Sequence, residues 1–177
     1  VWIRWLGWFG FNGGSELVVS NEAAAIAVSQ VFLNTNIAAS GGVVSTLLTS
    51  QVVTKKMDNT MAMNGAIAGL VAITAAPSAP SAGAALMIGA VGGIIVYFSI
   101  IILDRRFGID DPVGAISAHG VVGIWGVMAV VFTGGSLVSQ FVGVLAIAGF
   151  TYLMSLLTIL FIDRFIPIRA TDEEQEV

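Results

Sequence analysis

The stretch from residue 59 to residue 103 reads NTMAMNGAIAGLVAITAAPSAPSAGAALMIGAVGGIIVYFSIIIL and contains no charged side chain. It is interrupted once, at residues 76–81, where the sequence APSAPS is a cluster of turn-forming residues. About 20 apolar residues in a helix cross the hydrocarbon core of a bilayer. The stretch therefore predicts two membrane-crossing helices, over 60–76 and 82–103, joined by a short turn.

The remainder of the chain follows the same pattern. Two further runs without charge extend from Ala23 to Thr54 and from Pro112 to Ile162, and the second is broken by the sequence TGGS at residues 133–136. The sequence DDP at residues 110–112 is typical of a helix start, with a capping Asp and Pro at the first position. The sequence thus predicts helices over 1–14, 23–53, 60–76, 82–103, 112–132 and 137–162, followed by residues 163–177 as the start of a cytoplasmic tail.

The composition supports the same fold class. Of 177 residues, 56% are hydrophobic and 10% charged, whereas soluble domains carry about 25% charged residues. These values exclude an ordinary cytosolic enzyme and a disordered segment, and the lack of cysteine excludes a disulfide scaffold. Seven basic residues against 11 acidic ones leave no basic patch for nucleic acid. The prediction is an all-α membrane protein, a polytopic transmembrane helix bundle in the lipid bilayer.

The basic residues predict how the bundle is oriented. If the six segments alternate in direction, one side of the membrane receives six of the seven basic residues and the other side receives none. The positive-inside rule makes the basic side cytoplasmic. We therefore expect a multi-pass protein of the cell (inner or plasma) membrane whose cytoplasmic side holds the C-terminal tail and Lys55, Lys56, Arg105, Arg106, Arg164 and Arg169.

The first segment is too short to cross a membrane. Residues 1–14 would span about 21 Å as a helix, and the sequence lacks an initiating Met. We expect the sequence to begin inside a helix and to be a piece of a larger protein. Small residues at helix-packing spacing also predict close contacts between helices, with no functional role: Gly65 and Gly69, Gly89 and Gly93, and Gly120, Gly123 and Gly126.

His119 is the single histidine, and it lies about 12 Å along the predicted helix that starts at the cytoplasmic surface. An ionisable side chain at that depth suggests a pathway or a proton relay. A neutral imidazole bonded to a carbonyl of a neighbouring helix fits the position equally well. A metal site is not expected, because one histidine without Cys or acidic neighbours offers too few ligands.

The aromatic cluster of Trp5, Trp8, Phe9 and Phe11 also has two interpretations. Such clusters most often form an interfacial belt. Beside the hydroxyl of Ser15, however, aromatic faces could instead attract a small cation. Arg4 falls in a membrane segment without an evident partner, where a cation must snorkel, pair or face water.

Three motifs together resemble a known family. They are WFGFNGGS at residues 8–15, NGAIAGLVAIT at residues 64–74, and DDP at residues 110–112 followed by HGVVGI at residues 119–124. In this order and spacing they are similar to the ammonium transporter (Amt/Mep/Rh) superfamily, and to its Amt branch in particular. The resemblance covers essentially all of the chain but only the C-terminal half of the family's length.

The resemblance implies a fold and an activity. Members have eleven transmembrane helices, ten of them in two inverted repeats, and form homotrimers with one pore per subunit. This chain would supply the end of helix six through helix eleven. The implied function is ammonium and ammonia transport: ammonium is recruited at an outer aromatic vestibule, deprotonated, and passed through a hydrophobic, histidine-lined pore. No enzyme activity and no cofactor are implied, and a PII-type regulator is implied at the cytoplasmic face.

The resemblance also implies roles for individual residues. Phe11 matches one of two phenylalanines that gate the outer pore, and Ser15 matches a hydroxyl that receives ammonium. His119 matches one of a pair of pore histidines, and Thr74 lies in a motif associated with conduction. The partners of these residues belong to the family's first half, and the chain departs from the family at Arg4 and Gly114.

Two alternatives remain open at this point. Some Amt-like proteins are ammonium sensors that carry a signalling domain after the last helix, so sequence beyond Val177 would distinguish them from transporters. A small membrane assembly subunit that shares the packing motifs, or a truncated non-functional product, is the weaker alternative.

Overall fold

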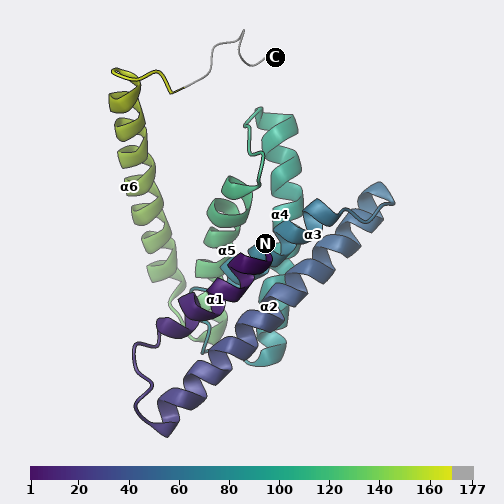
Figure 1. The fold of residues 1–177 in the computed structure, drawn as a ribbon, viewed down its shortest axis with the longest axis vertical. Coiled ribbons are helices and arrows are strands. Elements are labelled where there is room, and N and C mark those ends of the chain that lie inside the picture. The colour runs from purple at the N-terminus through teal and green to yellow at the C-terminus, as the bar shows by residue number, and fades with distance from the viewer. Residues whose placement is uncertain (169–177) are drawn as a thin grey trace. The chain divides into compact units, whose positions relative to one another are not determined.

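The computed structural model describes residues 1–168, and every regular element in that range is helical (Figure 1). The contacts divide the chain into two compact units, residues 1–137 and 138–177. The first unit holds α1 (Trp2–Gly14), α2 (Glu22–Thr54), α3 (Asn59–Ile73), α4 (Ala82–Phe107), the π-helix η1 (Ile116–Val121), α5 (Val122–Ala129) and the 3₁₀-helix η2 (Val130–Thr133). The second unit consists, in its described part, of α6 (Leu137–Asp163) and the few residues after it.

Side chains just outside α2, α3 and α4 fix where these three helices begin. The Asn21 side chain accepts a hydrogen bond from the Ala24 N–H at the start of α2. Asp58 accepts from two backbone N–H groups at the start of α3, and Ser81 accepts from one at the start of α4. These caps satisfy backbone donors that the first turn of a helix leaves unpaired.

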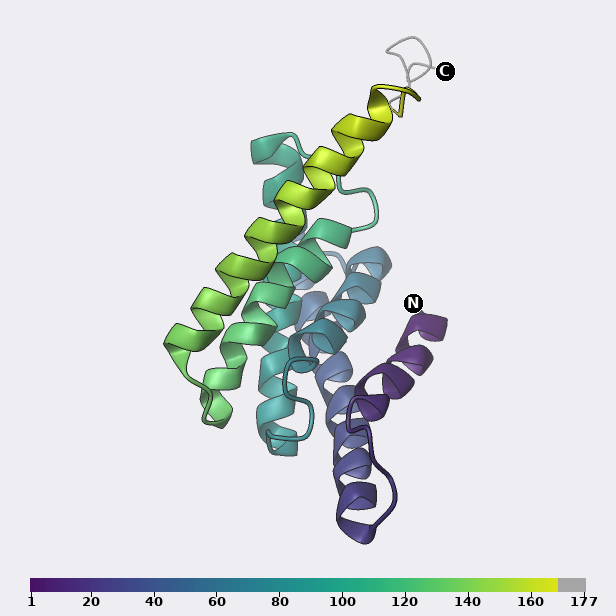
Figure 2. The ribbon, with the colours of Figure 1, turned by 90° about the vertical axis from the view of Figure 1, so that its left-hand side faces the viewer.

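The core of the first unit is the packing of α2, α3 and α4 (Figures 1 and 2). Glycines allow their backbones to touch: a Cβ added at Gly42 would overlap the carbonyl of Gly65, and one added at Gly89 would overlap Ala38. Across the same contact, the Thr46 hydroxyl lies 2.9 Å from the carbonyl oxygen of Gly93. Small residues let helices approach closely where lipid supplies no hydrophobic force between them.

The glycine motifs do not all behave alike. Gly65, Gly69, Gly89, Gly93 and Gly126 all lie against a neighbouring helix so closely that a Cβ would collide with it. A Cβ at position 120 or 123, by contrast, would meet nothing nearer than 3.8 Å. These last two glycines therefore leave open space beside η1 and α5 rather than a tight helix contact.

The turn between α3 and α4 is held by one buried side chain of α2. The Asn34 amide nitrogen donates to the carbonyls of Pro77 and Pro80 at 2.9 and 2.8 Å. Gln30, one turn earlier in α2, donates to the Asn34 side-chain oxygen at 3.0 Å. The turn brings α3 and α4 back against each other, so the start of α3 and the end of α4 lie at the opposite end of this unit from the turn (Figure 1).

Two predicted helix ends are wrong. The third predicted helix continues through Ala76, whereas α3 ends at Ile73, where the chain enters the turn that Asn34 holds. The fourth predicted helix stops at Leu103, whereas α4 continues to Phe107. Charged side chains need not end a helix that projects past the apolar layer, and Gly108, with φ of 61°, caps this one.

The predicted start of the fifth helix at Pro112 is also wrong. Residues 112–114 form a turn that includes Gly114 with φ of +68°, and the helix starts only at Ile116. Asp111 still acts as a cap, but over a longer reach. Its carboxylate accepts from the backbone N–H of Ile116 at 3.0 Å and of Ser117 at 2.9 Å.

Four stretches among the described residues are long and apolar enough to cross a membrane. They are α2, α4, residues Ile116–Thr133 and α6, and the shorter apolar helix α3 adds to them. α6 has no buried residue, and its most apolar window reaches a mean hydropathy of 2.2. A helix that is apolar on all sides requires an apolar environment, either lipid or another protein surface.

Candidate functional site

The candidate site is built around Trp8, on α1. Its indole ring stacks on the imidazole of His119 from η1, with ring centroids 6.2 Å apart and planes 15° apart. Phe11, three residues further along α1, lies beside the same indole at 6.0 Å, tilted by 56°. Separations of this size are typical of interacting aromatic pairs. The three rings therefore form one continuous cluster between α1 and η1.

Thr74 fixes the orientation of that indole. The Trp8 Nε1–H donates to the Thr74 Oγ1 at 2.8 Å, although the two residues are 66 positions apart in sequence. The same hydroxyl donates its hydrogen to the carbonyl of Leu70, one turn earlier in α3, at 2.7 Å. Since its own proton is used on Leu70, the hydroxyl presents a lone pair to Trp8.

The cluster borders a hollow of about 330 Å³. The hollow is mainly apolar, and its polar groups are the indole N–H, the Thr74 hydroxyl and the His119 imidazole. One wall is formed by His119, Gly123 and Val127, which follow one another at intervals of four residues and therefore lie on one helix face. The lining residues are Trp8, Phe11, Val71, Thr74, Ala75, His119, Gly123 and Val127.

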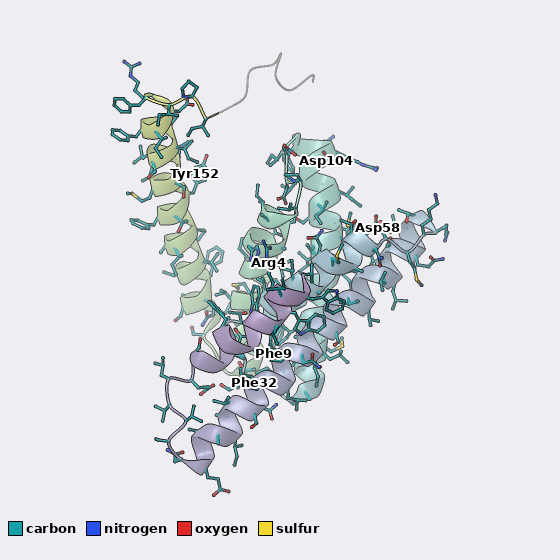
Figure 3. All side chains as sticks on the ribbon, in the orientation of Figure 1. Arg4, Phe9, Phe32, Asp58, Asp104 and Tyr152 are labelled. Atoms are coloured by element: carbon teal, nitrogen blue, oxygen red, sulfur yellow. The ribbon has the colours of Figure 1, made fainter. Side chains whose placement is uncertain are left out.

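The helix that carries Trp8 and Phe11 is also anchored to α2. Asn12 is buried, with 1% of its surface exposed, and its amide nitrogen donates to the Thr35 hydroxyl at 3.0 Å. Phe9 meets Phe32 of α2 edge-on, with centroids 5.5 Å apart, and Figure 3 labels both rings. These contacts hold α1 against α2.

Asp111 orders the backbone that carries His119. Its two hydrogen bonds hold the first turn of η1, two residues before the histidine. Burial raises the pKa of Asp111, but hydrogen bonds from Ser117 and Ile116 outweigh it, and the net effect lowers the pKa below its ordinary value. The carboxylate is therefore ionised at neutral pH, which strengthens these charge-assisted bonds.

A second hollow, of about 290 Å³, shares two walls with the first. It is lined by Arg4, Gly7, Trp8 and Phe11. Arg4 precedes Trp8 by four residues and thus lies on the same face of α1, and its side chain is exposed. Within residues 1–168, no carboxylate lies within ion-pair distance of its guanidinium, which leaves a positive charge beside the aromatic cluster.

Three of the four residues expected at the site lie together. Phe11, Thr74 and His119 all line the first hollow, whereas Ser15 does not. Ser15 lies at the end of α1, where its exposed hydroxyl donates to the carbonyl of Phe11 at 2.9 Å. It is therefore one turn beyond Phe11, outside the hollow.

Trp8 is the residue that sequence reasoning placed in the aromatic cluster without assigning it to the site. Nothing in the sequence indicated that its N–H would meet Thr74 or that its ring would meet His119. In the structure, the Trp8 ring lies against η1 and α3.

Comparison with known proteins identifies the family. The family model described as Ammonium Transporter Family matches residues 1–177. An ammonium transporter of Bacillus subtilis (strain 168) is 35% identical over 190 residues, covering 98% of this chain and 46% of that protein. The ammonium transporter Amt2 of Archaeoglobus fulgidus is 42% identical over 135 residues, covering 76% of this chain and 28% of that protein.

Solved structures agree with these sequence matches. A structure titled Sensor Amt Protein superposes with a TM-score of 0.88 at 32% identity, covering 97% of this chain and 44% of that one. Candida albicans Mep2 superposes with a TM-score of 0.82 at 30% identity, covering 96% of this chain and 41% of that one. The chain therefore spans less than half the length of the relatives it matches. The predicted fold class, an all-α helical bundle of a multi-pass membrane protein, is confirmed, and the chain belongs to the ammonium transporter family.

Proposed function

We propose that the protein transports ammonium across the membrane and that this chain forms the C-terminal half of the subunit. The observation that carries the proposal is the position of His119. The chain's single histidine lies on an apolar hollow, stacked on a tryptophan that is itself held by a hydrogen bond. Relatives named as ammonium transporters support the substrate.

The outer end of the path would be formed by Phe11 and Ser15. The Phe11 ring is 63% exposed and offers a face to a small cation. The Ser15 hydroxyl donates its proton to the Phe11 carbonyl, so its lone pairs remain available to the N–H groups of ammonium. An aromatic face beside an acceptor replaces part of the water that ammonium loses as it enters.

The apolar hollow would then select ammonia over ammonium. Transfer of an ion into an apolar space costs far more than transfer of a neutral molecule, so entry favours deprotonation. A neutral His119 imidazole has one acceptor and one donor nitrogen. It can therefore accept the proton as the N–H bond of ammonium breaks, or donate a hydrogen bond to the ammonia that forms. Potassium has no proton to lose, and it would meet the full desolvation cost.

Orientation and partners are part of the same proposal. The basic residues 55–56 directly follow α2, and residues 105–106 lie in the last turn of α4. The positive-inside rule makes that side cytoplasmic. Arg164 and the tail would share it; Arg169 and the rest of the tail lie outside the described residues. We propose a homotrimer in the cell membrane, with a PII-type regulator at the cytoplasmic face, as the family resemblance implies.

A second candidate function is ammonium sensing. The structure titled Sensor Amt Protein superposes on 97% of this chain. A sensor would bind ammonium at the same cluster without conducting it at a comparable rate. Binding without flux therefore separates the two functions.

The test uses the full-length protein in proteoliposomes at pH 6, where little free ammonia leaks through lipid. Wild type should take up ammonium faster than protein-free vesicles, and His119→Ala should reduce uptake by about tenfold or more. Val127→Ala, which alters an apolar wall of the same hollow, is the matched control and should retain uptake. Selective uptake that persists unchanged in His119→Ala would refute the role of His119. Ammonium-dependent quenching of tryptophan fluorescence without any uptake by wild type would favour the sensor.

A further inference from the structure

An apolar groove on α4 lies outside both hollows of the site. It has a volume of about 420 Å³ and runs along one face of α4, with a further wall from η1. Among the described residues that line it, Ser99 is the one polar residue, and only 8% of its surface is exposed. The apolar walls are Ile94, Ile95, Phe98, Ile102 and Leu103 of α4 and Val121 of η1.

The shape of the groove fits an elongated apolar occupant. Its walls on α4 extend from Ile94 to Leu103, a distance of about 14 Å along the helix axis. Ile94, Phe98 and Ile102 follow one another at intervals of four residues and are 42%, 42% and 46% exposed. An acyl chain that lies parallel to α4 would cover these side chains along the length of the groove.

Two arginines lie beyond the end of the groove, on the same side of α4. Arg105 and Arg106 are in the last turn of the helix, and both are exposed. Successive residues of an α-helix are rotated by about 100°, so both arginines fall within the arc that the groove residues cover. Asp104, which Figure 3 labels, falls outside that arc. Within residues 1–168, neither arginine forms an ion pair.

We propose that this groove binds an anionic phospholipid of the cytoplasmic leaflet, with an acyl chain along α4 and the phosphate at Arg105 and Arg106. The proposal goes beyond the proposed function and does not depend on it. Guanidinium groups bind phosphate oxygens through paired, charge-assisted hydrogen bonds. Basic pockets beside transmembrane helices on the cytoplasmic side recognise anionic headgroups. A zwitterionic headgroup carries its own cation, which opposes the attraction to the arginines.

Two other occupants predict different results. If another segment of the full-length protein covers the groove, no lipid chain can enter, and side chains that fill the groove should disturb folding. If the arginines attract anionic lipid without help from the groove, filling the groove should leave lipid binding unchanged. Variants of the arginines and of the groove walls, studied side by side, separate both cases from the proposal.

The experiment measures lipid binding to the purified, delipidated full-length protein in detergent by native mass spectrometry. The probes are phosphatidylglycerol and phosphatidylcholine with identical acyl chains. Wild type should bind phosphatidylglycerol more tightly. The double variant Arg105→Gln/Arg106→Gln should bind it about 30-fold more weakly, roughly fivefold for each arginine. Lys55→Gln/Lys56→Gln removes the same charge from the same side of the membrane but leaves the groove intact, so its affinity should remain within about twofold of wild type.

Filling the groove tests the position of the acyl chain. Ile102→Trp and Val121→Trp add bulk from its two walls, and each should weaken binding of phosphatidylglycerol about tenfold or more, because methylene groups of the chain lose their contacts. Ile124→Trp is the matched control, since Ile124 is 47% exposed, close to the 46% of Ile102, and does not line the groove. It should bind phosphatidylglycerol as wild type does.

Four outcomes would overturn the proposal. Equal affinity of wild type for the two lipids excludes headgroup recognition, and so does an unchanged preference in the double arginine variant, whose exposed positions tolerate glutamine. Normal binding by both Ile102→Trp and Val121→Trp removes the groove from the site. Misfolding of both these variants, with Ile124→Trp intact, shows that protein fills the groove. Because lipid binding is measured instead of uptake, absence of ammonium transport would not affect the result.

Discussion

Replacing Thr74 with valine should impair transport without unfolding the protein. Valine keeps the shape of threonine but cannot accept the Trp8 N–H bond, which is 2.8 Å long in the native site. The Trp8 ring is then free to leave the orientation in which it stacks on His119. Thr74 is thus a positioning residue that acts through Trp8.

The size of the effect follows from the one bond that is lost. A hydrogen bond of this kind contributes about 0.5–1.5 kcal/mol net. That energy corresponds to a roughly two- to tenfold smaller population of the oriented indole. If only the oriented state conducts, uptake of ammonium should fall by the same factor. Thr74→Ser retains the oxygen and should transport as wild type does.

The assay is ammonium uptake by full-length protein in proteoliposomes, with thermal unfolding measured on each variant. Thr49→Val is a closely matched control, because the Thr49 hydroxyl also donates to a carbonyl one turn earlier, at 2.7 Å, but lines neither hollow. It should leave uptake unchanged. The reasoning is wrong if Thr74→Val transports at the wild-type rate, or if Thr49→Val and Thr74→Ser are impaired as strongly.

Two further predictions concern stability. Asn34→Leu leaves the buried carbonyl of Pro80 and the carbonyl of Pro77 without their donor, so the free energy of unfolding, measured by thermal unfolding, should fall by about 2–5 kcal/mol. Gln30→Leu removes only one bond to Asn34 and should lower the free energy of unfolding by less. Equal losses in the two variants would contradict the role of Asn34. Because folding lowers the pKa of Asp111, its contribution is present above its unfolded pKa of about 3.9 and is lost as pH falls through the folded value. Asp111→Asn should therefore be less stable than wild type at pH 7, with the difference shrinking at acidic pH, and a difference independent of pH would count against the capping carboxylate.

Local signals in the sequence predicted much of the helical fold. The APSAPS turn at residues 76–81 was readable because Pro and Ser cluster there, and the start of α4 at Ala82 was readable from the same break. The start of the fifth helix was not. The sequence DDP predicted a helix from Pro112, but Gly114 adopts positive φ and the chain forms a turn there instead. Asp111 then caps η1, which starts at Ile116.

The site was only partly predictable for a different reason. His119 was indicated by its depth in the predicted helix as well as by the resemblance to a family, whereas Phe11 and Thr74 received their roles from the resemblance. The contact of Trp8 with Thr74 joins residues 66 positions apart, and no spacing rule indicates it. The glycines show the same limit. Gly69 and Gly123 occur in similar small-residue motifs, yet Gly69 touches the backbone of Ala38 and Gly123 borders the hollow. Only the packing of the helices distinguishes them.

The central claim is that the hollow beside Trp8 and His119 is part of the ammonium path, and thiol modification tests it most directly. The sequence contains no cysteine, so single cysteines can be placed at Ala75, which lines the hollow, and at Leu48, which is 57% exposed on α2 and does not. In an otherwise cysteine-free full-length protein, a small cationic methanethiosulfonate should block ammonium uptake by Ala75→Cys and leave Leu48→Cys active. Full uptake by Ala75→Cys after complete labelling would contradict the claim.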